Sequence, residues 1–388
     1  MADFDIAVVG AGLTGASLIV GLQGSGLKIA LIESQTPQKA EGWDARIYAY
    51  SPENIRFLNT LGVWQRLAQT RHQAVSLIKV YGDAGGELMF SAYESGVEAL
   101  AWIAEASPLQ VELWETLRRQ NNVTLFCPAS VCALEKTESH VQMALTDGRR
   151  LSAKLLIGAD GSQSSVRTLS NIQAQVKPYP QHGVVANFKT EKPHHGTAFQ
   201  WFDQGEILAY LPLPGQQMSM VWSVPPARAK ALVEASSEAL ESAVAKAGHH
   251  MLGSLQCVGP AREFPLNLMK VASPIASRTI LIGDAAHGIH PLSGHGVNLG
   301  FQDAAALVEV LCQRPDWMDP GSHTILRRYA RMRAEEPFVM QHFTDSIYRL
   351  FNTQNKALKL ARNCGMNALS TLPILSNTLV RYAICGRI

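Results

Sequence analysis

Residues 10–15 read Gly-Ala-Gly-Leu-Thr-Gly, directly after the apolar run 4–9 and directly before the helix-like stretch 16–20. An apolar run that leads through a glycine-rich turn into a helix is typical of the first strand, turn and helix of a dinucleotide-binding α/β fold. Because the helix N-terminus faces the turn, its free backbone N–H groups are suited to bind a phosphate. The stretch therefore predicts a nucleotide site at the start of the chain.

Each glycine of this turn has its own predicted task. Gly10 permits the tight turn, Gly12 lets the backbone approach a pyrophosphate, and Gly15 lets the helix pack closely on the strand. A second apolar run, 28–32, ends at Glu33, where an acidic side chain would accept hydrogen bonds from ribose hydroxyls. A solvated residue at the start of the next loop is the alternative for Glu33. With strand, turn, helix and acid in place, the sequence favours a dinucleotide site.

The composition is that of a globular protein with more than one core. At 388 residues the chain is long for a single core, so we expect two domains. The hydrophobic fraction of 47% and the charged fraction of 17% are ordinary for a globular protein. A net charge of +2 gives no reason to expect a nucleic-acid partner. The six cysteines form no C-x-x-C pair, so we expect reduced thiols and no metal site.

Residues near the two ends of the chain predict where in the cell the protein is located. Asp3 and Asp5 stand where a secretory signal has lysines, so we expect a cytoplasmic protein. No run of about 18 uninterrupted apolar residues occurs, so no membrane span is expected. The segment 366–388 mixes apolar with polar and basic residues, which suits a peripheral contact with the inner face of the membrane or with a partner protein. A terminal helix pair packed on the protein's own body is the alternative.

The pattern of the chain predicts α/β architecture with an insertion. Helical patterns occupy 52–69, 109–119 and 228–246, whereas alternating β patterns with turn signals occupy 183–224. We expect a Rossmann-like nucleotide-binding domain with an inserted antiparallel β-sheet substrate domain and a C-terminal helical segment. By residue number, the nucleotide-binding parts are 1–72, 104–172 and 269–330, the substrate-domain parts are 73–103 and 173–268, and the C-terminal helices are 331–388.

Two further motifs end apolar strands with an aspartate among small residues. Residues 157–161 read Ile-Gly-Ala-Asp-Gly, and residues 282–287 read Ile-Gly-Asp-Ala-Ala-His. Ligands of α/β sheets bind at the carboxyl ends of strands, so Asp284 is placed to accept hydrogen bonds from ribityl or ribose hydroxyls. The glycine-rich loop 288–300 then enters the helical stretch 301–311, whose N-terminal amides would stabilise negative charge on a ligand. Either motif alone also fits an ordinary turn.

Together these motifs resemble those of the group A flavoprotein aromatic hydroxylases, the para-hydroxybenzoate hydroxylase type, and within them the ubiquinone-biosynthesis hydroxylases. The resemblance covers nearly the whole chain and includes Asp-Ala-Arg at 44–46 and Leu-Pro-Leu-Pro at 211–214. Ile-His-Pro at 289–291 and the segment 344–351, which begins Thr-Asp-Ser and ends Leu-Phe, are the narrower signals for the ubiquinone branch.

The resemblance implies FAD as the cofactor. The first glycine turn and Glu33 would hold the ADP half, Arg46 and Gln110 the middle, and Asp284 with the loop 291–298 the ribityl and isoalloxazine end. Asp160 would support the fold and the approach of a nicotinamide. The implied cofactor-binding positions are Gly10, Gly12, Leu13, Thr14, Gly15, Glu33, Arg46, Gln110, Asp160, Gly283, Asp284, Pro291, Gly294, Gly296, Val297 and Asn298.

Two positions depart from the family pattern. Residues 293–296 read Ser-Gly-His-Gly where the family usually has Ala-Gly-Gln-Gly, and Ala106 stands where an Asn commonly precedes the Leu-Gln pair. The implied catalytic positions are Pro291 and His295. His295 either replaces the glutamine as a polar neighbour of the flavin or titrates near neutrality and alters the reactivity of the flavin.

The activity implied by the resemblance is hydroxylation of the aromatic ring of a polyprenylated phenol in ubiquinone biosynthesis, with O2, through a flavin hydroperoxide. The electron donor would be NAD(P)H as a transient visitor, or electrons would come from elsewhere. We expect a substrate pocket between the antiparallel sheet and the flavin, lined by Phe202, Leu211, Pro212 and Trp222, although each also fits core packing. The alternatives are a non-catalytic FAD-binding scaffold of a biosynthetic assembly, a prenyl reductase and a halogenase.

Overall fold

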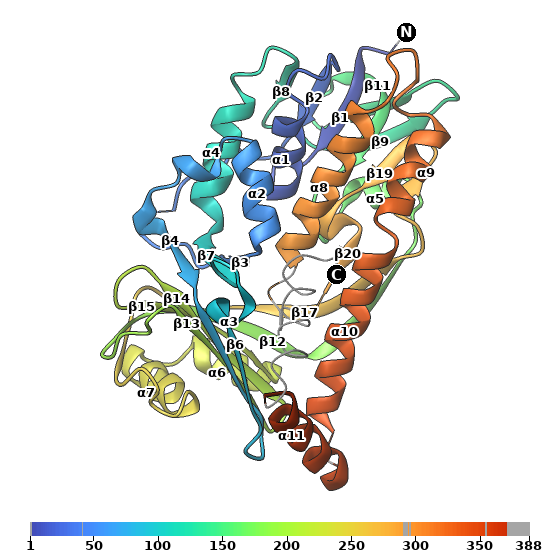
Figure 1. Cartoon of the computed structure of the whole chain (residues 1–388). Helices are drawn as coiled ribbons and strands as arrows, with labels where there is room; N and C mark the ends of the chain where they lie inside the picture. The colour runs from blue at the N-terminus through green and yellow to red at the C-terminus, as the bar shows by residue number, and fades with distance from the viewer. Residues whose placement is uncertain (1, 41, 290–293, 295, 354, 371–388) are drawn as a thin grey trace.

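The computed structural model describes residues 2–40, 42–289, 294, 296–353 and 355–370. A mainly parallel sheet forms the upper half of the molecule in Figure 1. Its strand order is β18-β19-β11-β1-β2-β8, and β9 and β10 extend it through β11. The strands are β1 (Phe4–Val9), β2 (Ile29–Ile32), β8 (Val123–Phe126), β9 (Val131–Lys136), β10 (Val141–Leu145), β11 (Arg150–Gly158), β18 (Ile275–Ala276) and β19 (Thr279–Leu281).

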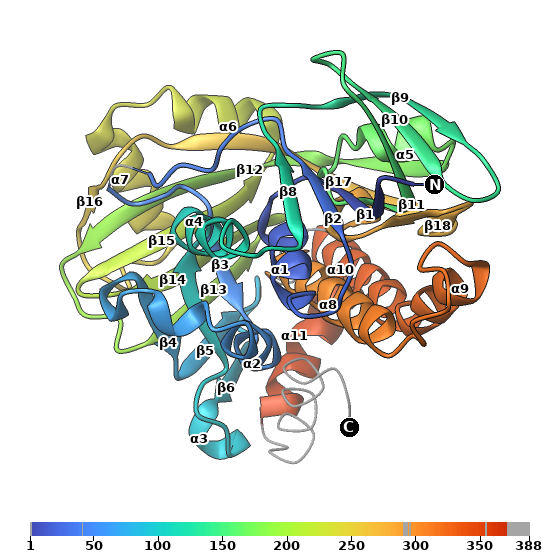
Figure 2. The ribbon, with the colours of Figure 1, turned by 90° about the horizontal axis from the view of Figure 1, so that it is seen from above.

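Helices cover this parallel sheet because its strands are apolar on both faces. All four residues of β2 are fully buried. One face packs against helices α1 (Leu13–Gly21), α2 (Pro52–Thr60), α4 (Ala106–Leu117), α8 (Gly296–Cys312) and α9 (His323–Met332). The opposite face packs against β9, β10 and helix α5 (Ser165–Leu169). Figure 2 shows α1 and α8 side by side, in agreement with their extensive contact. The predicted Rossmann-like fold class is confirmed.

A nine-stranded sheet forms the second layer, in the order β20-β17-β12-β15-β14-β13-β5-β6, with β16 on β12. Its pairs are antiparallel except for β13 and β5. Helices α6 (Pro226–Val233) and α7 (Ser237–Ala247) cover one face. The strands are β5 (Leu77–Tyr81), β6 (Glu87–Ser91), β12 (Ala174–Thr190), β13 (Thr197–Asp203), β14 (Glu206–Leu213), β15 (Gln217–Val224), β16 (Leu255–Cys257), β17 (Arg262–Val271) and β20 (His287–Gly288).

Smaller elements join the two halves. A three-stranded sheet, β3-β7-β4, lies between them, and the C-terminal helices α10 and α11 run down one side of the molecule (Figure 1). Their bounds are β3 (Ile47–Tyr50), β4 (His72–Val75), β7 (Ala101–Glu105), α10 (Glu335–Asn352) and α11 (Lys356–Ser370), with the short helices α3 (Ala92–Ser95), η1 (Trp64–Arg66), η2 (Gln69–Arg71) and η3 (Gly283–Ala285).

Two predicted helices differ from their sequence patterns, one by ending early and one by being divided in two. The pattern 52–69 yields α2, which ends at Thr60, because Gly62 takes a positive φ of 70° that no helix continues. The pattern 228–246 yields α6 and α7, because Ser236 leaves the helix and its side chain caps the N-terminus of α7. The division of the chain into domains by residue number stays a prediction.

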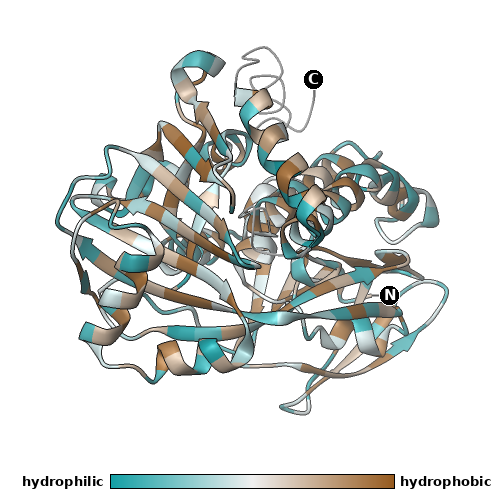
Figure 3. Ribbon diagram, turned by 90° about the horizontal axis from the view of Figure 1, so that it is seen from below, coloured by the Kyte–Doolittle hydropathy of each residue, from teal (hydrophilic) through white to brown (hydrophobic). Residues whose placement is uncertain are grey.

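Hydropathy follows the layers of the fold. Hydrophobic and hydrophilic residues alternate along strands of the second sheet in Figure 3, since one face of that sheet packs on α6 and α7. No helix among the described residues is both long and apolar enough to cross a bilayer.

Candidate functional site

The first glycine turn combines tight packing with one open position. A Cβ added to Gly10 would lie 2.4 Å from the carbonyl oxygen of Ala159, and one added to Gly15 would lie 2.1 Å from the carbonyl oxygen of Gly10. A Cβ added to Gly12 would meet nothing within 4 Å. Two glycines are therefore required by the protein's own packing, whereas Gly12 borders open space that a ligand would fill.

Side chains around this turn bind its middle residue, Ala11. The carboxylate of Glu33 accepts a hydrogen bond from the backbone N–H of Ala11 at 2.5 Å, and Gln110 Nε2 donates one to the carbonyl oxygen of Ala11 at 3.1 Å. The predicted residues Glu33 and Gln110 thus meet at the glycine turn, although Glu33 directly follows β2 and Gln110 belongs to α4. No side chain caps α1, and its first turn holds no acidic residue, so the amides of Leu13 and Thr14 stay suited to an anion.

The second aspartate motif lies directly beside the first helix. Thr14 of α1 is so close to Gly283 and Gly300 that a Cβ on either glycine would meet its hydroxyl, at 3.0 Å and 2.3 Å respectively. Gly283 and Asp284 belong to η3, and Gly300 belongs to α8. The N-terminal turns of α1 and α8 are therefore brought to one edge of the sheet together with Asp284.

Asp284 combines exposure to solvent with close surroundings of protein. The residue is exposed to solvent, yet burial by the surrounding protein raises the pKa of its carboxyl group. Both facts fit a side chain that protein surrounds on most sides and that opens toward a ligand on one. Such a carboxylate would accept hydrogen bonds from the hydroxyl groups of a bound molecule.

A buried ionic network, which the sequence did not reveal, binds the backbone of the Gly283–Asp284 motif. Asp303 of α8 accepts hydrogen bonds from the backbone N–H of Gly283 at 2.8 Å and from Arg333 Nε at 2.7 Å, and it lies 2.7 Å from His287 Nε2. Burial alone would lower the pKa of His287, but the carboxylate of Asp303 overcomes this and raises it. Burial would raise the pKa of Asp303, but His287 and Arg333 lower it. The network is therefore charged, and it fixes the position of η3.

Asp160 of the third motif has a local role. Its carboxylate accepts hydrogen bonds from the hydroxyls of Ser164 and Ser165 and from the backbone N–H of Val166. These bonds tie it to the first turn of α5, so the structure gives this predicted cofactor residue the contacts of a helix-capping residue.

The N-terminus of α8 is clamped to the start of α2. Asn298 is buried; its side chain donates to the carbonyl oxygens of Ala49 and Gly294 and accepts from the backbone N–H of Ser51 and from Asn54 Nδ2. The side chain of this predicted cofactor residue therefore makes its hydrogen bonds within the protein, and Val297 packs against the core. Gly294 lines the cavity described below, and Gly296 begins α8. The predicted catalytic residues Pro291 and His295 lie outside the described residues.

An ion pair between Glu105 and Arg71, which the sequence did not reveal, holds the Asp-Ala-Arg motif in place. The buried Glu105 accepts a hydrogen bond from the backbone N–H of Asp44 at 2.7 Å and forms an ion pair with Arg71 at 2.7 Å. Burial raises the pKa of Glu105. Arg46 is exposed and lies 3.5 Å from the Asp44 carboxylate. The motif therefore presents Arg46 on a rigid turn at the mouth of a cavity.

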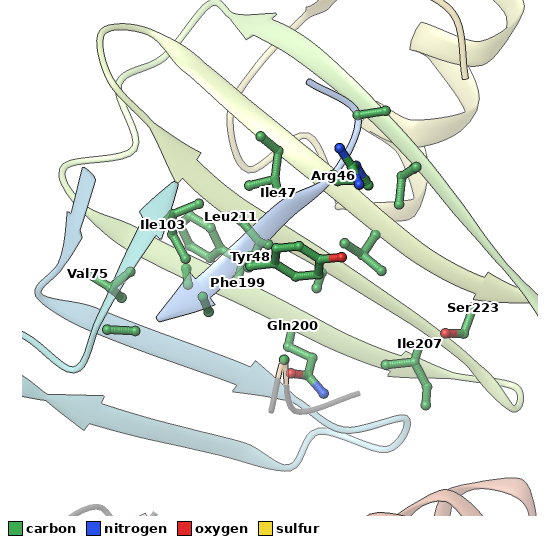
Figure 4. A pocket seen from close by; sticks show the side chains of 18 of the residues that line it. Arg46, Ile47, Tyr48, Val75, Ile103, Phe199, Gln200, Ile207, Leu211 and Ser223 are labelled. Carbon is green, nitrogen blue, oxygen red and sulfur yellow. The ribbon is translucent and has the colours of Figure 1, made fainter. Parts of the chain in front are cut away.

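A cavity of about 420 Å³ lies between the second sheet and the three-stranded sheet (Figure 4). Its size is in the range of small-molecule sites. Most of its wall is aliphatic or aromatic, with a few polar groups. It is lined by Asp44, Ala45, Arg46, Ile47, Tyr48, Ala49, Val75, Ile78, Ala101, Ile103, Val185, Ala198, Phe199, Gln200, Ile207, Ala209, Leu211, Val221, Ser223, Arg262, Glu263, Phe264 and Gly294.

Of the four predicted pocket residues, Leu211 is the one that lines this cavity. Trp222 is buried on the opposite face of the sheet, against α6 and α7. Pro212 follows Leu211 along β14, and successive side chains of a strand point to opposite faces. Phe202 stacks on Phe351 of α10, with ring centroids 3.9 Å apart. The cavity faces the side of the sheet that carries Ile207, Ala209 and Leu211.

The described residues fit FAD. The open space at Gly12 and the uncapped α1 provide a cradle for a pyrophosphate, and the Asp284 carboxylate provides acceptors for ribityl hydroxyls. Gly294, two residues before the start of α8, and Arg46 also line the cavity, so a flavin held by these motifs would lie next to it.

Comparison with known proteins agrees with this site. A family profile described as "FAD binding domain" matches residues 3–341. The fold, the glycine turn and the family profile together define an FAD-dependent oxidoreductase, and FAD is its cofactor.

Two curated relatives narrow the class. The chain is 32% identical to 3-demethoxyubiquinol 3-hydroxylase of Escherichia coli, with 98% of each chain covered. It is 31% identical to ubiquinone hydroxylase UbiL of Rhodospirillum rubrum, with 98% of this chain and 89% of the relative covered. The chain belongs to the FAD-binding-domain family and, within it, to the branch of the ubiquinone hydroxylases. The resemblance inferred from the motifs is thereby confirmed.

Solved structures show the same fold at low identity. The p-nitrophenol 4-monooxygenase PnpA of Pseudomonas putida superposes with a TM-score of 0.80 at 17% identity, with 99% of both chains covered. HpxO of Klebsiella pneumoniae, in complex with FAD and uric acid, gives a TM-score of 0.75 at 18% identity, with 98% of this chain and 96% of that chain covered.

Proposed function

We propose that the protein hydroxylates the aromatic ring of a prenylated phenol in ubiquinone biosynthesis, with O2 as the oxygen source. The observation that carries this proposal is the largely apolar cavity that meets the flavin site at Gly294 and Arg46. The names of the relatives, a demethoxyubiquinol hydroxylase and a ubiquinone hydroxylase, support the substrate class. They favour a monooxygenase over a non-catalytic scaffold, a prenyl reductase or a halogenase.

The protein's own residues supply placement and shielding. When bound, FAD supplies the redox chemistry that activates oxygen. The glycine turn and Asp284 hold the cofactor, and the Asp303 network keeps η3 in place. The cavity wall surrounds the ring with side chains such as Leu211, Phe199 and Ile103, which exclude water from the reacting carbon.

NAD(P)H is the proposed electron donor, as a transient visitor. Among the described residues the parallel sheet with its glycine turn is the single dinucleotide fold. A nicotinamide would therefore have to approach bound FAD from outside rather than from a domain of its own. Pro291 and His295 stay the predicted catalytic residues.

Cells that lack the protein provide the test of this function. We expect their lipid extract to accumulate a prenylated quinone precursor that lacks one ring hydroxyl, identified by mass spectrometry. The wild-type chain should remove the precursor, whereas Asp284→Ala should not. An unchanged quinone profile in the deletion strain would contradict the proposal.

We also propose a peripheral contact of a cytoplasmic protein with the inner face of the membrane, or with a ubiquinone-biosynthesis assembly, through the C-terminal segment. In α11 the exposed Leu358 and Leu360 accompany Lys356 and Lys359, and the helix contains no acidic residue. The other side of α11 docks on the β5–β6 hairpin, where Asn363 Oδ1 accepts from the backbone N–H of Gly86 at 2.9 Å. The predicted contact segment 366–388 therefore begins inside a docked helix, and residues 371–388 lie outside the described part.

Truncation after Ser370 tests the membrane contact without disturbing the fold, because the hydrogen bonds between α11 and the β5–β6 hairpin remain. We expect the truncated protein to keep its FAD but to co-sediment less with phosphatidylglycerol vesicles. In the full chain, Leu360→Ser should act in the same direction without loss of FAD. If both variants sediment like the wild type, the membrane contact lies elsewhere.

A further inference from the structure

One aromatic side chain of the cavity wall, that of Tyr48, also packs against the core of the parallel-sheet half. Tyr48 belongs to β3 and lines the cavity with its flanking residues Ile47 and Ala49. Figure 4 shows its ring projecting between apolar side chains such as Val75 and Ile103 on one side and the polar groups of Arg46 and Ser223 on the other. Tyr48 thus lies between an apolar end of the cavity and an end where polar groups accompany apolar side chains such as Ile207.

The ring of Tyr48 is held on a rigid base. Strand β3 pairs with β7, and Asn298 donates a 2.7 Å hydrogen bond to the carbonyl oxygen of Ala49, the next residue. The ring packs edge-on against Tyr50, with centroids 6.4 Å apart. A side chain fixed in this way loses little conformational freedom when it binds a ligand.

The hydroxyl of Tyr48 is available to a ligand. It has no hydrogen-bond partner among the residues that the structure describes, although the side chain is only partly exposed. Burial raises the pKa of Tyr48, and the negative charge of Asp284 adds to the rise. The phenol therefore keeps its proton at neutral pH. Its hydroxyl is a hydrogen-bond donor that points toward the side of the cavity that carries Ser223 (Figure 4).

Tyr50, two residues along the same strand, shows what the same side chain does without a ligand site. It is fully buried, packs against Trp64 and Phe301, and burial raises its pKa well above the ordinary value. Its hydroxyl is enclosed in the core, where no substrate reaches it. The two tyrosines therefore form a matched pair of one accessible and one enclosed hydroxyl.

We propose that Tyr48 is a substrate-binding residue whose hydroxyl donates a hydrogen bond to the phenolic oxygen of the substrate, with the prenyl substituent directed toward Val75 and Ile103. The inference rests on the proposed function. A hydrogen bond to this oxygen favours the phenolate, which makes the ring carbons more nucleophilic toward oxygen transfer. It also sets which ring carbon is presented for hydroxylation.

The test compares Tyr48→Phe with Tyr50→Phe in FAD-loaded, full-length protein. The ligands are ortho-prenylphenol and prenylbenzene, which lacks the hydroxyl, and binding is followed by the change in flavin absorbance. We expect Tyr48→Phe to weaken binding of ortho-prenylphenol about tenfold, the size of one lost hydrogen bond, and to leave prenylbenzene unaffected. The pKa of bound ortho-prenylphenol, read from its own absorbance, should rise in Tyr48→Phe. Tyr50→Phe should change neither property.

Equal losses for both ligands, or no loss for either, would overturn the proposal, because the hydroxyl would then not contact the phenolic oxygen. Loss of FAD from Tyr48→Phe would also overturn it, since the hydroxyl would then serve the cofactor. Turnover of ortho-prenylphenol by the wild type is measured in the same preparation. If no hydroxylated product forms but the selective tenfold effect is present, the proposed function fails and the binding role of Tyr48 stands.

Discussion

The two halves of the site are built in different ways. In the parallel sheet, short continuous motifs at the ends of β1 and β19 carry Gly12 and Asp284 to one edge. In the cavity, residues far apart in sequence, such as Val75, Leu211 and Ser223, arrive from different strands. A parallel sheet places every motif that follows a strand at the same edge, whereas the cavity wall depends on the register of each strand. The cofactor half is therefore local in sequence, and the substrate half is not.

The largest expected effect separates cofactor binding from folding in the local half. Gly12→Val introduces a side chain where no protein atom lies within 4 Å, and the φ of −63° at this position suits valine. We expect the apoprotein to keep its circular dichroism spectrum and to bind FAD about a thousandfold more weakly, which is about 4 kcal/mol. Full FAD content in Gly12→Val would show that the pyrophosphate lies elsewhere.

Asp303, the central residue of the buried ionic network, should affect both the stability of the protein and the binding of FAD near Asp284. Asp303→Asn leaves His287 and Arg333 without their carboxylate, so we expect a loss of about 3 kcal/mol in the free energy of unfolding, measured in urea, together with weaker FAD binding. The control is Asp319→Asn, which breaks the more exposed pair with Arg278 and should cost less than about 1 kcal/mol. Equal costs for the two variants would contradict a special role of the network.

Two leucines on opposite faces of β14, Leu208 and Leu211, should have separate effects on stability and on substrate binding. Leu208 is buried against α6 and α7, so Leu208→Ala should cost at least about 2 kcal/mol of stability without changing the affinity for ortho-prenylphenol. Leu211 lines the cavity, so Leu211→Ala should cost less stability and weaken binding of the prenylated ligand. The reverse pattern would mean that the opposite face of the sheet binds substrate.

The smallest expected effect is a pH dependence that comes from His287. Its pKa in the folded protein is raised above the ordinary 6.5 despite burial, because Asp303 favours the charged form. The stabilisation by protonated His287 is therefore complete below pH 6.5 and is lost as the pH rises through the raised pKa. We expect the stability difference between the wild type and His287→Gln to shrink with rising pH in this range. A constant difference would show that the imidazole is neutral in the folded protein.

The contrast between the two halves also explains which features of the fold and the site could be predicted from the sequence. The strand bounds of β1, the glycine turn and the Asp284 motif follow from residues that stand next to one another, and all lie where the patterns predict. Asp303 was missed because its partners His287 and Arg333 are 16 and 30 residues away, and only the fold brings them together.

The cavity was harder to predict because one residue of register moves a side chain to the other face of a sheet. Trp222 carries the larger apolar group, yet its neighbours Val221 and Ser223 face the cavity. Tyr48 gave no signal of its own, since Tyr50 repeats the same residue two positions later in the core. For Asp160, the hydroxyls of Ser164 and Ser165 indicate the helix cap that the motif alone did not suggest.

The most direct test of the central claim follows the oxygen atom. FAD-loaded protein is supplied with NAD(P)H, ortho-prenylphenol and isotopically labelled O2, and the products are analysed by mass spectrometry. We expect a ring-hydroxylated phenol that carries one labelled oxygen atom, formed by the wild type and not by Asp284→Ala. Consumption of NAD(P)H that yields only hydrogen peroxide, or a product whose new oxygen comes from water, would contradict it.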